Sequence, residues 1–463
     1  MRTVLASLGV LAALVVPLDA PARAARPARG NEAWTRLADT SAGFAVAYPR
    51  RWSARAAPQS ALVVVASYPL GPRAAWAPEP HRPLPADSVF LSLSVKHVKL
   101  MVPGELRTYP KRPAHLSFAA ATGETMEGFG PGRSLRFRAH GYGVEAQIAF
   151  GPRASARTRA QALRVVASLQ LAPLRLREQT IRVGGAPTGI AFARGSAWVA
   201  LATALVRIDG ATGRVERRIA IPAGGDYRHV SIAGDDAWLT DGAGRRASIV
   251  DVDLAAGRVR RVVPIECCAI GVAARGNDVW VTVPRETVGE VVRLDARTGR
   301  IVARIPVGNG PGPIAIAGSR VWVWNTSAPT SLLAIDPLTN RVAGGAALHG
   351  VSDVAAGPAG LWAAGDSIGI VQIDPRSGRI LRRTSSVSGA RSLAVGDRAV
   401  YASQTVCGVC TESFVTRTGI AAGLAGAAVP AGKLAVDLAL GGGALWVAGF
   451  GGGTVTRIPV QNA

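Results

Sequence analysis

Short apolar runs separated by tight turns fill the chain from Pro187 onward. Between Pro187 and Ile219, two apolar runs, GIAF and AWVAL, precede a third run that ends in VRID, a glycine turn and an alternating tail. Runs of this length bounded by turn residues are typical of β-strands. This stretch therefore predicts four short strands joined by tight turns.

The same unit recurs to the end of the chain. Each copy has an aromatic residue in its second run, and successive aromatic residues lie 40, 42, 42, 40, 39 and 45 positions apart. These aromatic markers are Trp198, Trp238, Trp280, Trp322, Trp362, Tyr401 and Trp446. Repeats of about 40 to 45 residues with four strands each are typical of propeller blades. The pattern predicts a mainly β chain that contains a seven-bladed β-propeller.

The third run of five copies ends in an Asp that is followed four residues later by Gly or Asn. The pairs are Asp209 and Gly213, Asp253 and Gly257, Asp295 and Gly299, Asp336 and Asn340, and Asp374 and Gly378. A short Asp side chain bonds backbone amides ahead of it, and the fourth position favours a residue that tolerates a left-handed conformation. We therefore interpret these Asp residues as turn formers and not as metal ligands.

The last copy stops after its third strand, TVTRIPV (Thr454 to Val460). The missing fourth strand lies at the front, because the segment from Arg177 to Pro187 aligns without gaps on the segment from Ile301 to Pro311. Residues from about Leu174 to Val183 are expected to pair with the C-terminal strands and close the circle. Closure leaves no open sheet edge.

The blades, with P-x-G-I followed by G-S-A-W-V-A and R-I-D-x-x-T-G in the first copy, resemble YVTN-type and streptogramin-lyase-like seven-bladed β-propellers. The resemblance covers residues 174–463 and implies the propeller fold. Its members serve as lyases, ligand binders and protein-interaction rings, so the fold alone does not select a function.

The N-terminus has the features of a secretory signal peptide over residues 1–24. Arg2 precedes an apolar run from Val4 to Leu18, and a small-x-small cleavage site lies at Ala22 to Ala24. The apolar run is short for a membrane span, although an uncleaved anchor is the alternative. We expect a secreted or extracytoplasmic protein of the cell envelope with no transmembrane segment after cleavage.

Residues 31–172 lack the four-strand repeat of the blades, and their pattern predicts a small α+β domain. Strand-like runs such as SALVVVASYPL and VEAQIAFG precede a helical stretch that places Ala156, Ala160, Leu163, Val166 and Leu169 on one stripe. Its opening GFAVAYPRRW and closing ALRVVASLQL weakly resemble PsbP-like extracytoplasmic domains.

The formal net charge is +23, from 53 Lys and Arg against 30 Asp and Glu. The basic residues are nearly all Arg, are scattered over both predicted domains and are not interleaved with aromatic residues as in a single-strand binding groove. A nucleic-acid partner is therefore not expected. Attraction to an anionic envelope polymer stays open.

The four cysteines form two tight pairs, Cys267 with Cys268 and Cys407 with Cys410. Oxidised pairs are usual in exported proteins. Blades three and six, which carry the pairs, lie on roughly opposite sides of the predicted ring, so cross-pairing is not expected. Two local disulfides are predicted, with a zinc site or redox chemistry as the alternatives.

The innermost strands should bring polar residues to the mouth of the ring. Positions nine and ten residues before each aromatic marker are the candidates, and several copies carry polar or charged residues there. The predicted ligand-binding set is Arg228, His229, Asp353, Arg391, Ser392 and Asp437, with Tyr227 and Glu266 on the rim. A solvated funnel whose charges balance one another is the alternative.

Two functions are compatible with this mouth. The first is a non-enzymatic, exported binding protein that captures a small ligand, an envelope polymer or a protein partner, without a cofactor. The second follows from the resemblance to streptogramin lyases, which implies a His general base beside a carboxylate-held Mg²⁺. In that lyase or hydrolase, His229 is the candidate base and Asp353 or Asp437 the candidate metal partner.

Overall fold

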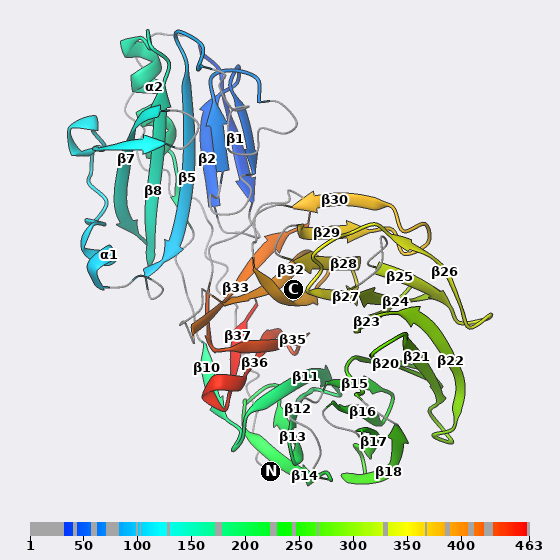
Figure 1. The fold of residues 1–463 in the computed structure, drawn as a ribbon. Helices are drawn as coiled ribbons and strands as arrows, with labels where there is room; N and C mark the ends of the chain where they lie inside the picture. Colours follow the sequence, from blue (N-terminus) through cyan, green and yellow to red (C-terminus); the bar gives the residue numbers. More distant parts are fainter. Residues whose placement is uncertain are drawn as a thin grey trace, which may run out of the picture.

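The computed structural model describes residues 32–39, 44–56, 63–70, 83–98, 101, 103–126, 130–171, 178–222, 229–242, 247–265, 268–326, 332–365, 368–384, 389–405, 412–420 and 429–460. The predicted signal peptide lies outside the described residues. The chain is mainly β, with a β-propeller preceded by a small α+β unit (Figure 1). The expected fold class is therefore confirmed.

The N-terminal unit holds a three-stranded and a six-stranded sheet in the orders β1-β2-β9 and β3-β4-β5-β8-β7-β6. The strands are β1 (Trp34–Asp39), β2 (Phe44–Pro49), β3 (Ser53–Ala56), β4 (Val63–Ala66), β5 (Val89–His97), β6 (Thr122–Met126), β7 (Gly130–Ala139), β8 (Tyr142–Phe150) and β9 (Gln170–Leu171). The helical pieces are α1 (Pro103–Arg107), the 3₁₀ turn η2 (Phe118–Ala120) and α2 (Ala156–Ala167). Helix α2 packs against β2, β5 and β8 over one apolar core.

The predicted stripe is confirmed at its C-terminal end, where Val166 and Leu169 are buried and Leu163 packs against the core, but not at the start of α2. Ala156 and Ala160 are exposed, whereas Thr158, Ala162 and Val165 are buried. The N-terminal cap explains this difference: the Asp87 carboxylate accepts hydrogen bonds from the Thr158 hydroxyl at 2.7 Å and from the Ser155 amide at 2.8 Å. These bonds turn Thr158 inward, so the first buried residue of α2 is polar. The spacing of apolar residues alone does not identify it.

The propeller consists of seven four-stranded antiparallel sheets in the described part of the chain. The innermost strands are β11 (Pro187–Ala193), β15 (Val230–Ala233), β19 (Val272–Arg275), β23 (Pro311–Ala317), β27 (Asp353–Gly357), β31 (Ala390–Val395) and β35 (Ala435–Gly441). The second strands are β12 (Ser196–Leu201), β16 (Asp236–Asp241), β20 (Asp278–Val283), β24 (Arg320–Asn325), β28 (Gly360–Gly365), β32 (Ala399–Thr405) and β36 (Ala444–Gly449). Each innermost strand contacts the next one around the ring, and β35 contacts β11 (Figure 1).

The third and outermost strands complete each blade. The third strands are β13 (Ala204–Asp209), β17 (Ala247–Asp253), β21 (Gly289–Asp295), β25 (Leu332–Asp336), β29 (Gly369–Ile373), β33 (Glu412–Gly419) and β37 (Thr454–Pro459), the last preceded by the 3₁₀ turn η3 (Phe450–Gly452). The outermost strands are β14 (Val215–Ala220), β18 (Arg258–Ile265), β22 (Ile301–Gly308), β26 (Arg341–Ala346), β30 (Ile380–Thr384), β34 (Val429–Lys433) and β10 (Gln179–Arg182). Strand β18 alternates between exposed and partly buried positions, as predicted for an outer strand.

The circle closes as the sequence predicts. Strand β10 pairs antiparallel with β37, and Ile181 lies opposite Val455. Ile181 and Val183 are both buried against the first and last blades. The outer strand of the last blade thus comes from the N-terminal side of the first blade and covers the edge of β37.

The aromatic markers are buried on the second strands, and several carry a cation across the sheet. Trp280 lies opposite Arg293, whose guanidinium carbon is 4.8 Å from the ring centroid, and Trp446 lies opposite Arg457 at 5.5 Å. A guanidinium over an indole face is favourable and uses the apolar stem of Arg to cover the ring. The other face of the marker fills the space between neighbouring blades, as Trp198 does against Val230 and Trp238 against Val272.

The predicted Asp turns are confirmed. In the first blade, the Asp209 carboxylate accepts hydrogen bonds from the amide of Thr212 at 2.8 Å and from its hydroxyl, and Gly213 has a φ of 70°. Asn340, the one non-glycine at this position, has a φ of 54°. The hydrogen bonds hold the pKa of Asp209 below its usual range, so these carboxylates serve the turns.

Candidate functional site

A cavity of about 470 Å³ lies at the centre of the ring, lined by residues from all seven innermost strands or the residues just before them. Its walls carry small residues at many positions, among them Gly271, Ala273, Ala315 and Ala355. Seven strands around a common axis leave a gap that such small side chains do not fill. The cavity is therefore a product of the ring geometry and of this composition.

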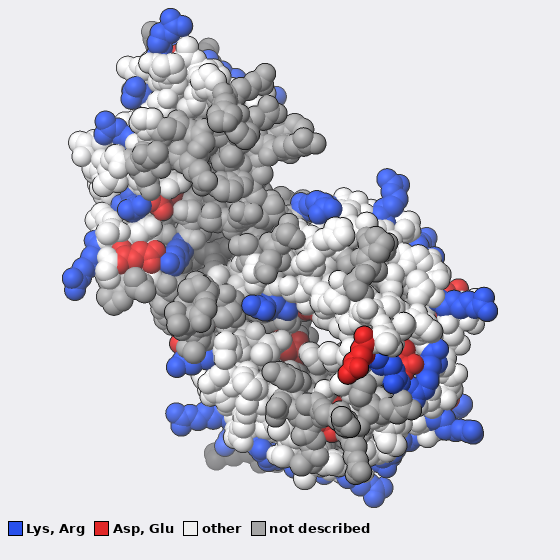
Figure 2. All heavy atoms as spheres, in the orientation of Figure 1, with Lys and Arg blue, Asp and Glu red and all other residues white. Residues whose placement is uncertain are grey.

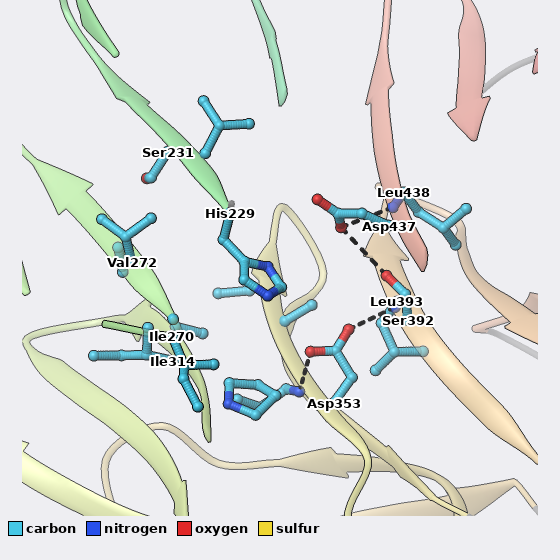
Figure 3. Close-up of a pocket in the computed structure, with 18 of the residues that line it drawn as sticks. His229, Ser231, Ile270, Val272, Ile314, Asp353, Ser392, Leu393, Asp437 and Leu438 are labelled. Atoms are coloured by element: carbon cyan, nitrogen blue, oxygen red, sulfur yellow. Dashed lines mark hydrogen bonds between the residues drawn. The ribbon is translucent and has the colours of Figure 1, made fainter. Parts of the chain in front are cut away.

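The predicted site residues that the structure describes meet in this cavity. His229, Asp353, Arg391, Ser392 and Asp437 all line it. Figure 3 shows His229 on one side, with Asp353, Ser392 and Asp437 across from it. Tyr227, Arg228 and Glu266 lie outside the described residues. His349, the other histidine of the propeller segment, is exposed and is not among the residues that line the cavity.

Backbone irregularities explain why adjacent residues reach the cavity. The pairing register shifts between Ala390 and Ser392 and between Ala435 and Asp437, so Arg391 and Val436 are extra residues in their strands. Such bulges break the alternation of side chains between the two faces of a strand. Both positions that the sequence analysis considered, nine and ten residues before the marker, therefore line the site.

The two carboxylates join neighbouring blades. Asp353 Oδ2 accepts a hydrogen bond from the amide of Leu393 on the next innermost strand at 2.7 Å, and Oδ1 accepts one from the amide of Val354 at 2.8 Å. Asp437 Oδ2 accepts one from the amide of Ile190 at 2.8 Å, and Oδ1 from the amide of Leu438 at 2.8 Å and from the Ser392 hydroxyl at 3.4 Å. Both acids thus serve the ring as well as the cavity (Figure 3).

Enclosure by the ring changes the acidity of both groups. Burial raises the pKa of Asp353 to about 7, and the nearby charge of Asp437 adds to the rise against the opposing hydrogen bonds from the backbone. Burial likewise raises the pKa of Asp437, while the charge of His229 opposes that rise. A carboxylate with few water neighbours loses the solvation that favours its charged form. The cavity therefore holds a proton that is exchangeable near neutral pH.

Hydroxyl groups on the second strands form further links that the sequence analysis did not identify. Thr240 Oγ1 accepts a hydrogen bond from the His229 amide at 3.2 Å and donates one to the Ile270 carbonyl of the next blade at 2.7 Å. Thr282 Oγ1 repeats this arrangement between Gly271 and Gly312. Each hydroxyl lies two residues after its aromatic marker, which is the signal that could have found them.

A ring of seven aliphatic residues was also missed. Each lies eight residues before an aromatic marker, one position beyond the polar candidates, and all line the cavity. We call this set the aliphatic ring: Ile190, Val230, Val272, Ile314, Val354, Leu393 and Leu438. Six of the seven are buried, with Ile314 partly exposed, so the ring packs the blades together directly beside the polar groups.

The described residues do not fit the Mg²⁺ site of the lyase hypothesis. No group of three or more His, Cys, Asp and Glu within the described ranges is placed to hold a metal ion. Each oxygen of Asp353 and Asp437 accepts one backbone amide, and the other side chains of the cavity wall with a possible ligand atom are His229, Ser231, Ser352 and Ser392. Mg²⁺ is held in proteins by carboxylates together with bound waters, and the described part of this wall brings two carboxylates with no third acidic ligand beside them.

The cysteine predictions are tested only at Cys268, which is half-buried and has a φ of 46°. Cys267, Cys407 and Cys410 lie outside the described residues. The two local disulfides therefore stay a prediction.

Comparisons with known proteins support the fold alone. Neither a family profile nor a curated protein sequence matches the chain. Among solved structures, Kuenenia stuttgartiensis hydrazine synthase matches with a TM-score of 0.50 and 14% identity over 60% of this chain and 96% of that chain. The Cps50 (Swd1) β-propeller domain of Myceliophteria thermophila matches with a TM-score of 0.50 and 14% identity over 61% of this chain and 100% of that domain. The chain is thus similar to β-propellers in structure. No helix within the described ranges has the length and hydropathy needed to cross a membrane.

Proposed function

We propose that this chain is an exported binding protein that captures a small ligand in the central cavity of its propeller. The observation that carries the proposal is a cavity of about 470 Å³ that places His229, Ser392 and two acids beside an aliphatic ring. Small-molecule sites are typically about 300 to 1,000 Å³ and combine apolar walls with a few converging polar groups. A cavity of this size favours a small molecule over a polymer or a folded protein partner.

A melting screen with a small-molecule library tests the proposal. Ligands that raise the melting temperature of the wild type should lose their effect in Ser352→Phe, because Ser352 lines the cavity and a phenyl ring there occupies ligand volume. Thr180→Phe is the matched control, since Thr180 is exposed on the outermost strand β10. Stabilisation that survives in Ser352→Phe would place the ligand elsewhere and contradict the proposal.

Export rests on the N-terminal sequence, with Arg2, the apolar run and the site at Ala22 to Ala24. The measurement is N-terminal sequencing of the protein recovered from the natural host. A mature chain that begins just after Ala24, found outside the cytoplasm, supports export. A chain that retains residues 1–24 in the cytoplasmic fraction contradicts it.

A lyase that uses His229 as general base is the other candidate from the sequence, and the structure supports it less. Its required metal has no adequate ligand set among the described residues. Added Mg²⁺ or Mn²⁺ should leave the melting temperature unchanged, and no turnover is expected on cyclic depsipeptides. A metal-dependent rise in melting temperature together with turnover would favour the lyase.

A further inference from the structure

Two acids occupy the same position in two different blades, nine residues before the aromatic marker. The other five blades have Gly189, His229, Gly271, Pro313 and Ser392 at that position. The ring therefore closes at five junctions without a carboxylate there. Joining the blades does not require the negative charges of Asp353 and Asp437.

Both charges are placed where they are costly. Each carboxylate lies in the wall of a ring that restricts its access to water, and the charge of Asp437 opposes the ionisation of Asp353. Like charges in one poorly solvated site are common at functional positions. The arrangement calls for a positive partner in the cavity.

The described cationic groups that line the cavity do not supply that partner fully. They are His229, Arg275 and Arg391. Both arginines are exposed, so water screens their charge. Figure 2 shows acidic side chains near the hollow at the centre of the ring, some with Lys or Arg beside them, and further Lys and Arg along the outer edge. His229 faces the acids, and a single imidazole brings at most one positive charge against two carboxylates.

The free hydrogen-bond acceptor sites of the two carboxylates also favour a positively charged ligand. Each oxygen of Asp353 and Asp437 accepts a backbone amide, yet an ionised carboxylate has about four acceptor sites. Ser392 Oγ adds an acceptor beside Asp437 Oδ1. An ammonium group brings three donors and one positive charge, which matches this set of acceptors.

We infer that the ligand of the central cavity is a small organic cation with a primary ammonium group, which Asp353, Asp437 and Ser392 bind. This inference rests on the proposed function and names its ligand class. Binding of the cation favours the ionised carboxylates and releases protons. Because the pKa of Asp353 is raised to about 7, the affinity for an ammonium ion increases as the pH rises from 5.5 to 8.

The test uses the full-length protein and three probes of one shape: cyclohexylamine, cyclohexanol and cyclohexanecarboxylate. Calorimetry or ligand-observed NMR at pH 7.5 gives their affinities. We expect cyclohexylamine to bind at least about tenfold more tightly than cyclohexanol, and the carboxylate to bind most weakly. The affinity for cyclohexylamine should fall about five- to tenfold between pH 8 and pH 5.5, while that for cyclohexanol changes little.

Asp437→Asn and Asp353→Asn should each remove most of the preference for the amine over the alcohol. Asp397→Asn is the matched control, because Asp397 is exposed and does not line the cavity. The pH series on the wild type needs no variant, so it tests the inference even if an Asn variant does not fold.

Three results separate the possibilities. Preference for the amine that is lost at low pH supports the inference. If cyclohexanol or cyclohexanecarboxylate binds as tightly as cyclohexylamine or more tightly, the ligand is not an ammonium ion and the inference is overturned. If that probe also competes with library ligands, the cavity stays a ligand site. Failure of every probe and every library ligand to bind overturns the inference together with the proposed function.

Discussion

The Asp437 carboxylate on β35 accepts a hydrogen bond from the amide of Ile190 on β11, a residue 247 positions earlier in the chain. This bond joins the last blade to the first at the inner edge of the ring. At the outer edge, Ile181 on β10 lies opposite Val455 on β37. The ring is therefore closed at both edges by residues from opposite ends of the propeller sequence.

Closure at the outer edge predicts a stability effect at Ile181. Ile181→Ala should lower the free energy of unfolding by about 2 to 4 kcal/mol, because the side chain is buried between the first and last blades. Thr180→Ala, an exposed neighbour on the same strand, should change it by less than about 0.5 kcal/mol. Urea unfolding measures both. Equal effects of the two variants would show that the β10–β37 pairing does not hold the ring.

The raised pKa of Asp353 predicts a dependence of stability on pH. The folded state holds the proton of this carboxyl up to about pH 7, whereas the unfolded chain releases it near the ordinary value of 3.8, so ionisation destabilises the fold as the pH rises. Relative to the wild type, Asp353→Asn should gain about 1 to 2 kcal/mol between pH 5 and pH 7. Urea unfolding at four pH values gives the difference.

Asp374→Asn is the control for this experiment. Hydrogen bonds from the Ser377 hydroxyl and the Arg376 amide hold the pKa of Asp374 below its usual range, so this group stays ionised from pH 5 to pH 8. Its difference from the wild type should be constant over that interval. A constant difference for Asp353→Asn as well would contradict the raised pKa.

Alanine substitutions at two glycines with left-handed backbones separate the cost of backbone strain from the cost of a steric clash of the new Cβ. Gly276 has a φ of 60° and open space where a Cβ would lie, so Gly276→Ala should cost about 1 kcal/mol from backbone strain alone. Gly378 has a φ of 74°, and its Cβ would lie 2.5 Å from the Gly345 carbonyl oxygen. Gly378→Ala should therefore cost at least about 1 kcal/mol more. Thermal melting of both variants checks the order, and the reverse order would contradict the blade contact at Gly345.

Much of the fold is predictable because each blade repeats the same local chemistry. The spacing of the aromatic markers, the Asp turns and the missing outer strand each follow from residues within one copy, and closure then requires only a match between Ile181 and its equivalent Ile305. The start of the buried face of α2 was not predictable in this way. Thr158 turns inward through its hydrogen bond to Asp87, which lies far from the helix in sequence.

The sequence predicted which residues line the candidate site but not the hydrogen bonds that they make. Counting back from the markers gives His229, Asp353, Ser392 and Asp437, which line one cavity. The same count does not show that Asp353 and Asp437 bond amides of the next blade, since the partners Leu393 and Ile190 belong to other copies. The aliphatic ring could have been predicted by the same count, because its residues lie eight positions before each aromatic marker.

The cysteine pairs predict an oxidised protein. If Cys267 pairs with Cys268 and Cys407 with Cys410, thiol titration of the denatured, unreduced protein should find essentially no free thiol. Peptide mapping should find no link between the third and sixth blades. Four free thiols, or stoichiometric zinc, would contradict the prediction of two local disulfides.

The central claim is that the centre of the ring is the ligand site, and intermolecular NOEs from a bound probe to methyl groups of the protein test it most directly. With cyclohexylamine as the probe, we predict NOEs to methyl groups of the aliphatic ring, such as those of Val272 and Ile314, which line the cavity. Val215 and Val302 on the outermost strands are exposed and should give none. NOEs to these outer valines without any to the aliphatic ring would contradict the account.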